Sequence, residues 1–111
     1  MKIETNAENG IVGFIFEGRL DAVSSEEAES TMMKAIAEKG CYLYDLTALD
    51  YISSAGLRVL LSTSKQIKRN EGRFVMCAPN DNIRHVLDIS GFASIFPLVE
   101  TLDEGQRMLA E

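Results

Sequence analysis

Hydrophobic and polar residues alternate along two segments at the start of the chain, residues 3–8 and 11–17. The dipeptide Asn9-Gly10 separates these segments. Asn-Gly between two alternating runs is typical of a tight hairpin turn, because both central residues of such a turn need positive φ. The pattern therefore predicts that the chain opens with two antiparallel strands.

Apolar residues recur at helical spacing after the hairpin. Ser24-Ser25-Glu26-Glu27 has the S-x-x-E pattern of a capping box, and it predicts a helix that runs to about Lys39 and stops at Gly40. Three more helices are predicted: one with an apolar face from Leu57 to Ile67 that ends at residues 70–72, one from residues 79–81 to Gly91, and one that follows a second capping box at residues 101–104.

Short, nearly continuous apolar segments lie between the helices, at residues 41–46, 73–78 and 95–99. Such segments are typical of strands that are covered on both faces. The order is then β-β-α-β-α-β-α-β-α, which predicts an α/β fold with a mixed, mostly parallel sheet of four to five strands and four helices. We expect one domain over residues 1–111, because half of this length would bury too small a core.

Composition narrows the possible partners and location. The chain has 17 acidic and 11 basic residues, a net charge of −6, which argues against nucleic acid as a partner. No segment is apolar for long enough to cross a bilayer, and the first residues do not form a signal peptide, so we expect a soluble, cytoplasmic protein. The basic side chains of Lys65, Lys68, Arg69 and Arg73 cluster where positive charge complements the dipole at a helix end.

The chain lacks the sequence motifs of metal sites, redox sites and nucleotide-binding loops. Cys41 and Cys77 lack metal or redox spacing and are expected to act as small core hydrophobes. The one histidine, His85, has no second ligand at metal spacing and is expected at the surface. Neither a G-x-G-x-x-G loop nor a Walker A sequence is present. We therefore expect no metal, no cofactor and no enzymatic activity.

The segment DYISSAGLRVLL, residues 50–61, places two hydroxyls just before an apolar helical run. Ser53 or Ser54 can cap the helix by accepting hydrogen bonds from amides of the first turn, or one of them can be a chemical handle. A serine hydrolase would need Ser54 as nucleophile and His85 as base, but the G-x-S-x-G pattern is absent. Asp21, Asp45 and Asp50 are interpreted as solvated loop carboxylates near strand ends.

Three segments in the same order resemble anti-sigma factor antagonist (STAS) domains. YDLTALDYISSAGLRVLL at residues 44–61 is similar to the central strand, loop and helix of that family. EGRLDA at residues 17–22 is similar to its Gly-x-Leu-Asp step after the second strand, and HVLDISGFASIFPLVETLDEG at residues 85–105 resembles its third helix and last strand. The resemblance thus covers nearly the whole chain and implies the element order already derived.

The resemblance implies a small binding protein that sequesters an anti-sigma factor, itself a serine kinase, and that releases it when the kinase phosphorylates one serine. By its position before Gly56-Leu57 that serine is Ser54, with Ser53 as the alternative acceptor. A serine phosphatase would reset the switch. The partner-binding residues implied are Asp21, Ser53, Ser54, Ala55, Gly56 and Arg58. Asp21 is also open to a plain turn role.

Two residues depart from the family pattern. Ser53 stands where many members carry aspartate, and Arg58 is larger and more charged than the residue often found there. STAS domains also occur in stress-signalling complexes and lipid-transport systems, so an unregulated adaptor subunit is the alternative function. Small Ala55 and Gly56 are expected to leave the backbone accessible to a partner.

Overall fold

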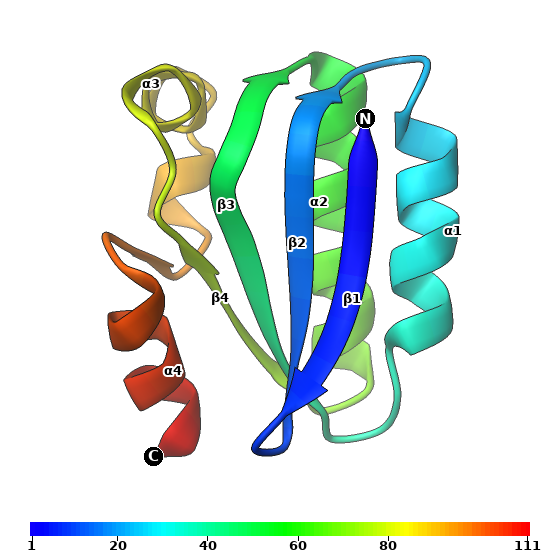
Figure 1. Ribbon diagram of the computed structural model, residues 1–111, viewed down its shortest axis with the longest axis vertical. Coiled ribbons are helices and arrows are strands. Elements are labelled where there is room, and N and C mark those ends of the chain that lie inside the picture. Colours follow the sequence, from blue (N-terminus) through cyan, green and yellow to red (C-terminus); the bar gives the residue numbers. More distant parts are fainter.

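The computed structural model describes residues 1–111 and contains a five-stranded sheet in the order β1-β2-β3-β4-β5 (Figure 1). β1 is antiparallel to β2, and all other neighbouring strands are parallel. The α/β fold predicted from the sequence is therefore confirmed. The bounds are β1 Lys2–Glu8, β2 Ile11–Leu20, α1 Ser25–Ala35, β3 Cys41–Ile52, α2 Ser54–Arg69, β4 Arg73–Cys77, α3 Asp81–Ile89, η1 Phe92–Ser94, β5 Leu98–Val99 and α4 Leu102–Ala110.

Helices cover the two faces of the sheet unequally. α1 and α2 lie side by side on one face, over a core that includes Tyr42 and Tyr44 of β3 (Figure 1). Leu43 points to the other face, where it joins Val75 and Leu109 under α4. Successive side chains of a strand alternate between faces, so one apolar strand contributes to both layers. This explains why the central segments are nearly continuous in apolar character.

The Asn9-Gly10 turn joins β1 and β2 as predicted, with φ values of 54° and 79°. The register pairs Lys2 with Glu17. Met1 lies beside Gly18, since a Cβ placed on that glycine would be 3.6 Å from the Met1 Cα atom. The N-terminus is therefore at the end of the sheet where β2 and β3 finish, whereas the C-terminus lies at the opposite end (Figure 1).

The first helix ends earlier than its pattern suggested. α1 stops at Ala35, and the backbone at Ile36 is already extended, so the predicted end near Lys39 is wrong. The Tyr42 hydroxyl accepts a hydrogen bond from the Ala37 N–H at 2.7 Å, and Lys39 adopts a positive φ of 56°. These tertiary contacts hold the segment out of helical geometry, and the sequence pattern of one helix does not report them.

Three strands differ clearly in length from the prediction. β2 runs to Leu20 rather than ending at residue 17. β3 extends to Ile52, because its pairing with β2 continues through two register shifts to the Leu20–Ile52 pair. The last strand is shorter than residues 95–99 and comprises Leu98 and Val99 alone. Before it, the chain forms the short helix η1, and the buried Phe96 packs edge-on against Phe92 at 5.3 Å between ring centroids. Burial of Phe96 displaces the chain from strand geometry there.

The basic cluster divides between helix α2 and strand β4. Lys68 and Arg69 occupy the last turn of α2, as predicted. Arg73 instead belongs to β4, and its guanidinium donates to the carbonyl oxygens of Met108 at 2.7 Å and Glu111 at 3.0 Å. Arg73 therefore caps the C-terminal end of α4, because those carbonyls have no partner within the helix.

The cysteines are free, and Cys77 is buried under α4. A side chain at Gly105 would overlap the Cys77 Sγ atom, so the helix approaches the strand closely at this glycine. Burial, followed by the negative charges of Asp45 and Glu104, raises the pKa of the Cys77 thiol to about 12. Cys77 is thus an unreactive core residue, as expected from the sequence.

None of the helices combines the length and the apolar character needed to cross a membrane.

Candidate partner-binding surface

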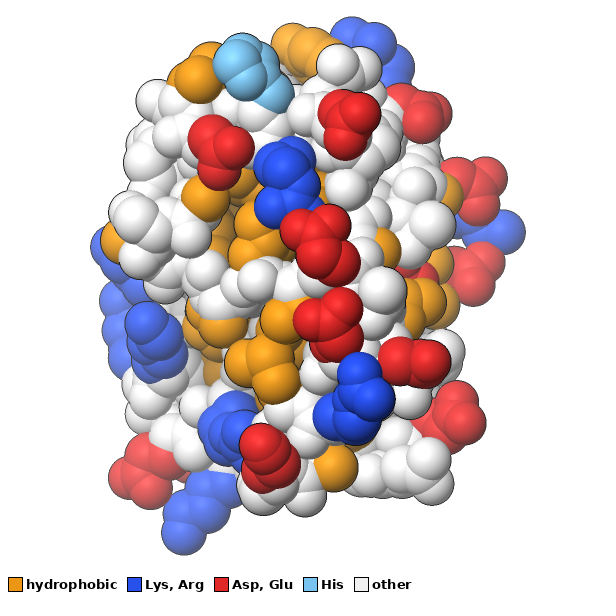
Figure 2. Space-filling view, turned by 90° about the vertical axis from the view of Figure 1, so that its left-hand side faces the viewer, with side chains coloured by type: hydrophobic (Ala, Val, Ile, Leu, Met, Phe, Trp, Pro, Cys, Tyr) orange, Lys and Arg blue, Asp and Glu red, His pale blue; other side chains and the backbone are white.

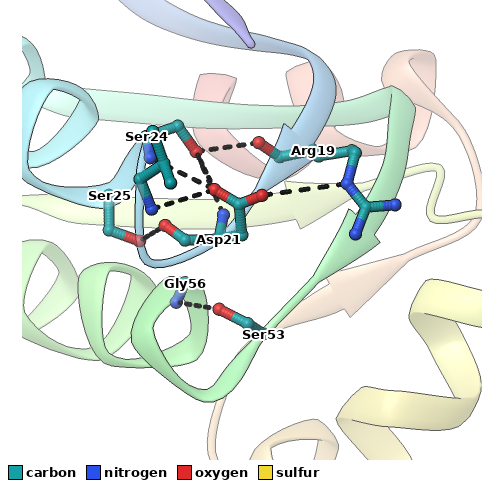
Figure 3. Close-up of polar contacts among 7 residues, drawn as sticks. Arg19, Asp21, Ser24, Ser25, Ser53 and Gly56 are labelled. Atoms are coloured by element: carbon teal, nitrogen blue, oxygen red, sulfur yellow. Dashed lines mark hydrogen bonds and ion pairs between the residues drawn. The ribbon is translucent and has the colours of Figure 1, made fainter.

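The two serines at the start of α2 have different environments. Ser53 is the N-cap: its backbone is extended, and its Oγ accepts a hydrogen bond from the Gly56 N–H at 3.3 Å (Figure 3). Ser54 is the first helical residue, and its side chain is exposed and takes no part in the cap. The cap and the chemical handle, which were alternatives from the sequence, are therefore properties of two different residues.

Gly56 brings this helix start against the end of β2. A Cβ at Gly56 would lie 2.5 Å from the carbonyl oxygen of Leu20 and 2.7 Å from Cγ1 of Ile52. The same Leu20 oxygen accepts a hydrogen bond from the Ser53 N–H at 3.0 Å. Gly56 is consequently buried, so the expectation that it offers open backbone to a partner is wrong, and its role is to allow this close approach.

The loop between β2 and α1 is held by its own polar groups (Figure 3). Asp21 Oδ1 accepts hydrogen bonds from the N–H groups of Val23 at 3.1 Å and Ser24 at 3.2 Å. The Ser24 Oγ accepts from the Asp21 N–H at 3.0 Å and donates to the Arg19 carbonyl at 2.8 Å, while the Ser25 hydroxyl donates to the Asp21 carbonyl. The loop therefore has one defined shape.

These contacts correct the predicted capping box at the start of α1. The Ser24 side chain makes no capping hydrogen bond with the helix, because it bonds to the loop on its N-terminal side. Asp21 supplies an acceptor in this loop that the S-x-x-E pattern does not consider. The turn role of Asp21 is thus observed, and any contact with a partner would be additional.

The Asp21 carboxylate is stabilised in its charged form. The hydrogen bond from the Ser24 N–H is the largest cause of the lowered pKa of Asp21, and the Val23 N–H, the Ser24 hydroxyl and the Arg19 guanidinium contribute in the same direction. The Arg19 Nε atom lies 3.7 Å from Oδ2, and the guanidinium also stacks 4.1 Å from the centroid of the Tyr51 ring. An ionised acid and a stacked cation therefore border the serine pair at neutral pH.

We define the serine surface as six residues that are all at least partly exposed: Asp21 and Val23 of the loop before α1, and Ser53, Ser54, Ala55 and Arg58 at the start of α2. Arg58 is exposed one turn after Ser54, on the same side of α2. The surface thus contains every residue that the sequence implied for partner binding except Gly56. It also contains Val23 and adjoins Arg19 and Tyr51, which the sequence did not single out.

The other candidate residues lie elsewhere. Asp50 is exposed near the end of β3, but Asp45 pairs in register with Ile15 and Cys77 within the sheet rather than in a loop. His85 is exposed on α3, as predicted, and appears at the surface in Figure 2. No group of three or more His, Cys, Asp or Glu side chains is arranged to hold a metal ion.

One groove of the molecule is remote from the serines. It measures about 450 Å³ and lies between α4 and the strands, with Gly13, Asp45 and Arg107 among its lining residues. A serine nucleophile needs a substrate cleft and a base within hydrogen-bond reach. Ser54 does not line this groove, and His85, the base that the hydrolase interpretation requires, is exposed on α3.

Comparison with known proteins places this chain in a defined class of α/β domains. The STAS domain family matches residues 2–105. BtrV of Bordetella bronchiseptica, described as a candidate anti-sigma factor antagonist, is 36% identical over 103 residues, which cover 91% of this chain and 88% of BtrV. This chain therefore belongs to the STAS domain family.

Solved structures share the fold at lower identity. An anti-sigma factor antagonist from Mycobacterium paratuberculosis superposes with a TM-score of 0.90 at 22% identity, over 99% of this chain and 94% of the other. The Bacillus cell fate determinant SpoIIAA in its phosphorylated form superposes with a TM-score of 0.72 at 18% identity, over 96% and 98% of the two chains. At these identities the similarity establishes the fold.

Proposed function

We propose that this chain is a cytoplasmic anti-sigma factor antagonist: it binds an anti-sigma factor that has serine kinase activity, and phosphorylation of Ser54 ends the binding. The observation that carries the proposal is the difference between the two serines. Ser53 caps α2, whereas Ser54 is exposed in the first helical turn, where a kinase can reach it without opening the cap. A serine phosphatase would restore the binding form.

The comparisons support this function by two routes. BtrV, which aligns with nearly all of this chain, is described as a candidate anti-sigma factor antagonist. SpoIIAA, which shares the fold, has a phosphorylated form with a solved structure. Phosphorylation is therefore compatible with this architecture.

The location of Ser54 suits a switch that leaves the fold intact. A phosphate at a helix N-terminus is stabilised by the helix dipole and by unpaired amides of the first turn. It adds about −1.5 to −2 charges at neutral pH. If the partner buries this surface, an unpaired dianion costs about 3–5 kcal/mol, which converts tight binding into weak binding. The unmodified protein therefore binds and the phosphorylated protein is released.

The test is direct binding to each ATP-binding anti-sigma kinase of the source organism, purified singly. We expect Ser54→Ala to bind one of these kinases like the wild type, and Ser54→Asp to lose at least tenfold in affinity. Gln106→Asp is the matched control, because it adds the same charge to an exposed polar side chain on α4, in a groove remote from the serines, and should bind normally. Circular dichroism should show that all three variants are folded.

Incubation with the bound kinase and ATP then identifies the acceptor by mass spectrometry. Ser53→Ala should still be phosphorylated, whereas Ser54→Ala should not. If Ser54→Asp binds as tightly as the wild type and no phosphate appears on either serine, the proposed switch is wrong. The unregulated adaptor would then be the better description.

A further inference from the structure

Val23 is an aliphatic side chain that is almost completely in water. Its exposed fraction is 92%, compared with 71% for Ile89 on α3, the next highest among the large apolar residues. Single exposed aliphatic residues are common on protein surfaces and need no explanation by themselves. The unusual property of Val23 is that the loop around it is fixed.

The hydrogen bonds of the loop prevent Val23 from turning inward. Its own N–H donates to Asp21 Oδ1, and Ser24 and Ser25 on its C-terminal side are bonded to Asp21 as well. The Ser24 hydroxyl also donates to the Arg19 carbonyl, which ties the loop to the end of β2. Val23 is therefore presented in one orientation, so little conformational entropy is lost when a partner covers it.

The position of this loop relative to α2 makes Val23 part of the serine surface. The Leu20 carbonyl accepts a hydrogen bond from the Ser53 N–H, and Gly56 packs against that carbonyl, so the end of β2 and the start of α2 are in direct contact. On the adjoining strand ends, Arg19 is in register with Tyr51 and stacks on its ring. Arg19 engages Asp21 through Nε, which leaves its two Nη nitrogens for another acceptor.

We propose that Val23 is the apolar anchor through which this chain binds its anti-sigma partner. Val23 enters an apolar pocket of the partner, and a partner carboxylate at the rim of that pocket binds the Arg19 Nη groups. The inference rests on the proposed function and names the contact by which the same surface recognises the partner. It fits the general anatomy of interfaces, in which a rigid apolar or aromatic anchor is surrounded by a polar rim.

The experiment measures dissociation constants for the kinase that binds the wild-type chain. We expect Val23→Ser to weaken binding by about 10- to 100-fold, since it removes most of the apolar area of the anchor. Val23→Ile should restore binding to within a few-fold. Ile89→Ser is the matched control, because it removes another highly exposed aliphatic side chain, on helix α3, and it should leave the dissociation constant unchanged.

Arg19→Gln tests the rim. We expect this variant to bind several-fold more weakly than the wild type at low salt, and to lose part of the salt dependence of binding, because a surface ion pair is screened by salt. The stack with Tyr51 and the ion pair with Asp21 are lost in the same variant. Its thermal unfolding should therefore be recorded beside that of the wild type.

The outcomes separate this inference from the proposed function. If Ser54→Asp abolishes binding but Val23→Ser binds like the wild type, the anchor is wrong and the phosphoserine switch stands. If Val23→Ser and Ile89→Ser weaken binding equally, the anchor is also wrong. If no anti-sigma kinase binds the wild type, the proposed function fails, and the inference fails with it.

Discussion

Two helices of this protein begin at the second residue of a Ser-Ser dipeptide, and the two dipeptides are used differently. At α2, Ser53 caps the helix through its Oγ and Ser54 remains exposed. At α1, Ser24 bonds to the preceding loop and Ser25 is buried, with its hydroxyl on the Asp21 carbonyl. The difference arises upstream: the carbonyls of Arg19 and Asp21 accept from the serine hydroxyls at α1, whereas at α2 the end of β2 accepts from the backbone N–H of Ser53.

The comparison shows that a serine hydroxyl near a helix start becomes available to an enzyme or a partner only when another group forms the hydrogen bonds that the backbone there requires. At α2 the cap residue Ser53 accepts the hydrogen bond from the backbone, and the hydroxyl of Ser54 remains exposed. At α1 both hydroxyls are engaged in holding the loop. A pair of serines before a helix is therefore a signal for modification only after the hydrogen bonds of both residues are known.

Among substitutions at these two helix starts, Gly56→Ala is expected to change the free energy of unfolding most, because Gly56 packs one helix start against the loop that precedes the other. The added methyl group would meet the Leu20 carbonyl and Ile52 and force the loop and helix apart. We expect a loss of about 1–3 kcal/mol in the free energy of unfolding. This figure is the net loss, after the gain of about 1 kcal/mol that alanine normally gives over glycine in a helix.

Urea denaturation measures the loss for Gly56→Ala. Arg58→Ala on the exposed side of the same helix is the control and should change the free energy of unfolding by no more than about 0.5 kcal/mol. A Gly56→Ala protein as stable as the wild type would show that the loop and the helix start are not in contact in solution.

Alanine substitutions of the two serines of α2 should have smaller effects on stability, and these effects should differ from each other. Ser53→Ala removes the acceptor for the Gly56 N–H, and loss of an N-cap costs about 0.5–2 kcal/mol. The 3.3 Å length of this hydrogen bond favours the lower half of that range. Ser54→Ala should change stability by no more than about 0.5 kcal/mol. Thermal unfolding of both variants checks the order, and equal losses would contradict the assignment of Ser53 as the cap.

The smallest effect is local and concerns the loop before α1. The pKa of Asp21 in the folded protein is lowered from 3.8, so its stabilising hydrogen bonds are present above that pH and are lost as the pH falls through the lowered value. We expect the amide resonances of Val23 and Ser24 to shift together in this acidic range when followed by NMR. Asp21→Asn keeps an acceptor oxygen and should remove the titration while retaining the loop. Shifts that persist in Asp21→Asn would point to another titrating group.

Features set by neighbouring residues were predictable from the sequence. The Asn9-Gly10 turn, the Asn80 cap of α3 and the Thr101 cap of α4 depend on local chemistry, and each is present in the structure. The end of α1 and the length of β3 depend on contacts with distant segments, the hydroxyl of Tyr42 and the pairing with β2. Periodicity within one segment carries no information on such contacts.

The candidate site shows the same limit. The serine pair was recognisable, but its division into a cap and an exposed hydroxyl requires the position of the Gly56 N–H. Arg19 and Tyr51 are far apart in the sequence and become neighbours through the register of β2 and β3. The exposure of Val23 follows from the hydrogen bonds of Asp21, which a pattern of hydrophobic and polar residues does not reveal.

The opposite placement of the two chain ends has a practical consequence for binding assays. Met1 lies beside Gly18, at the end of the sheet that carries the serine surface, whereas Glu111 lies at the far end (Figure 1). A fluorescent reporter fused ahead of Met1 would stand next to the serine surface and compete with a partner by bulk alone. Immobilisation of the chain through Glu111 would instead orient that surface toward the solution.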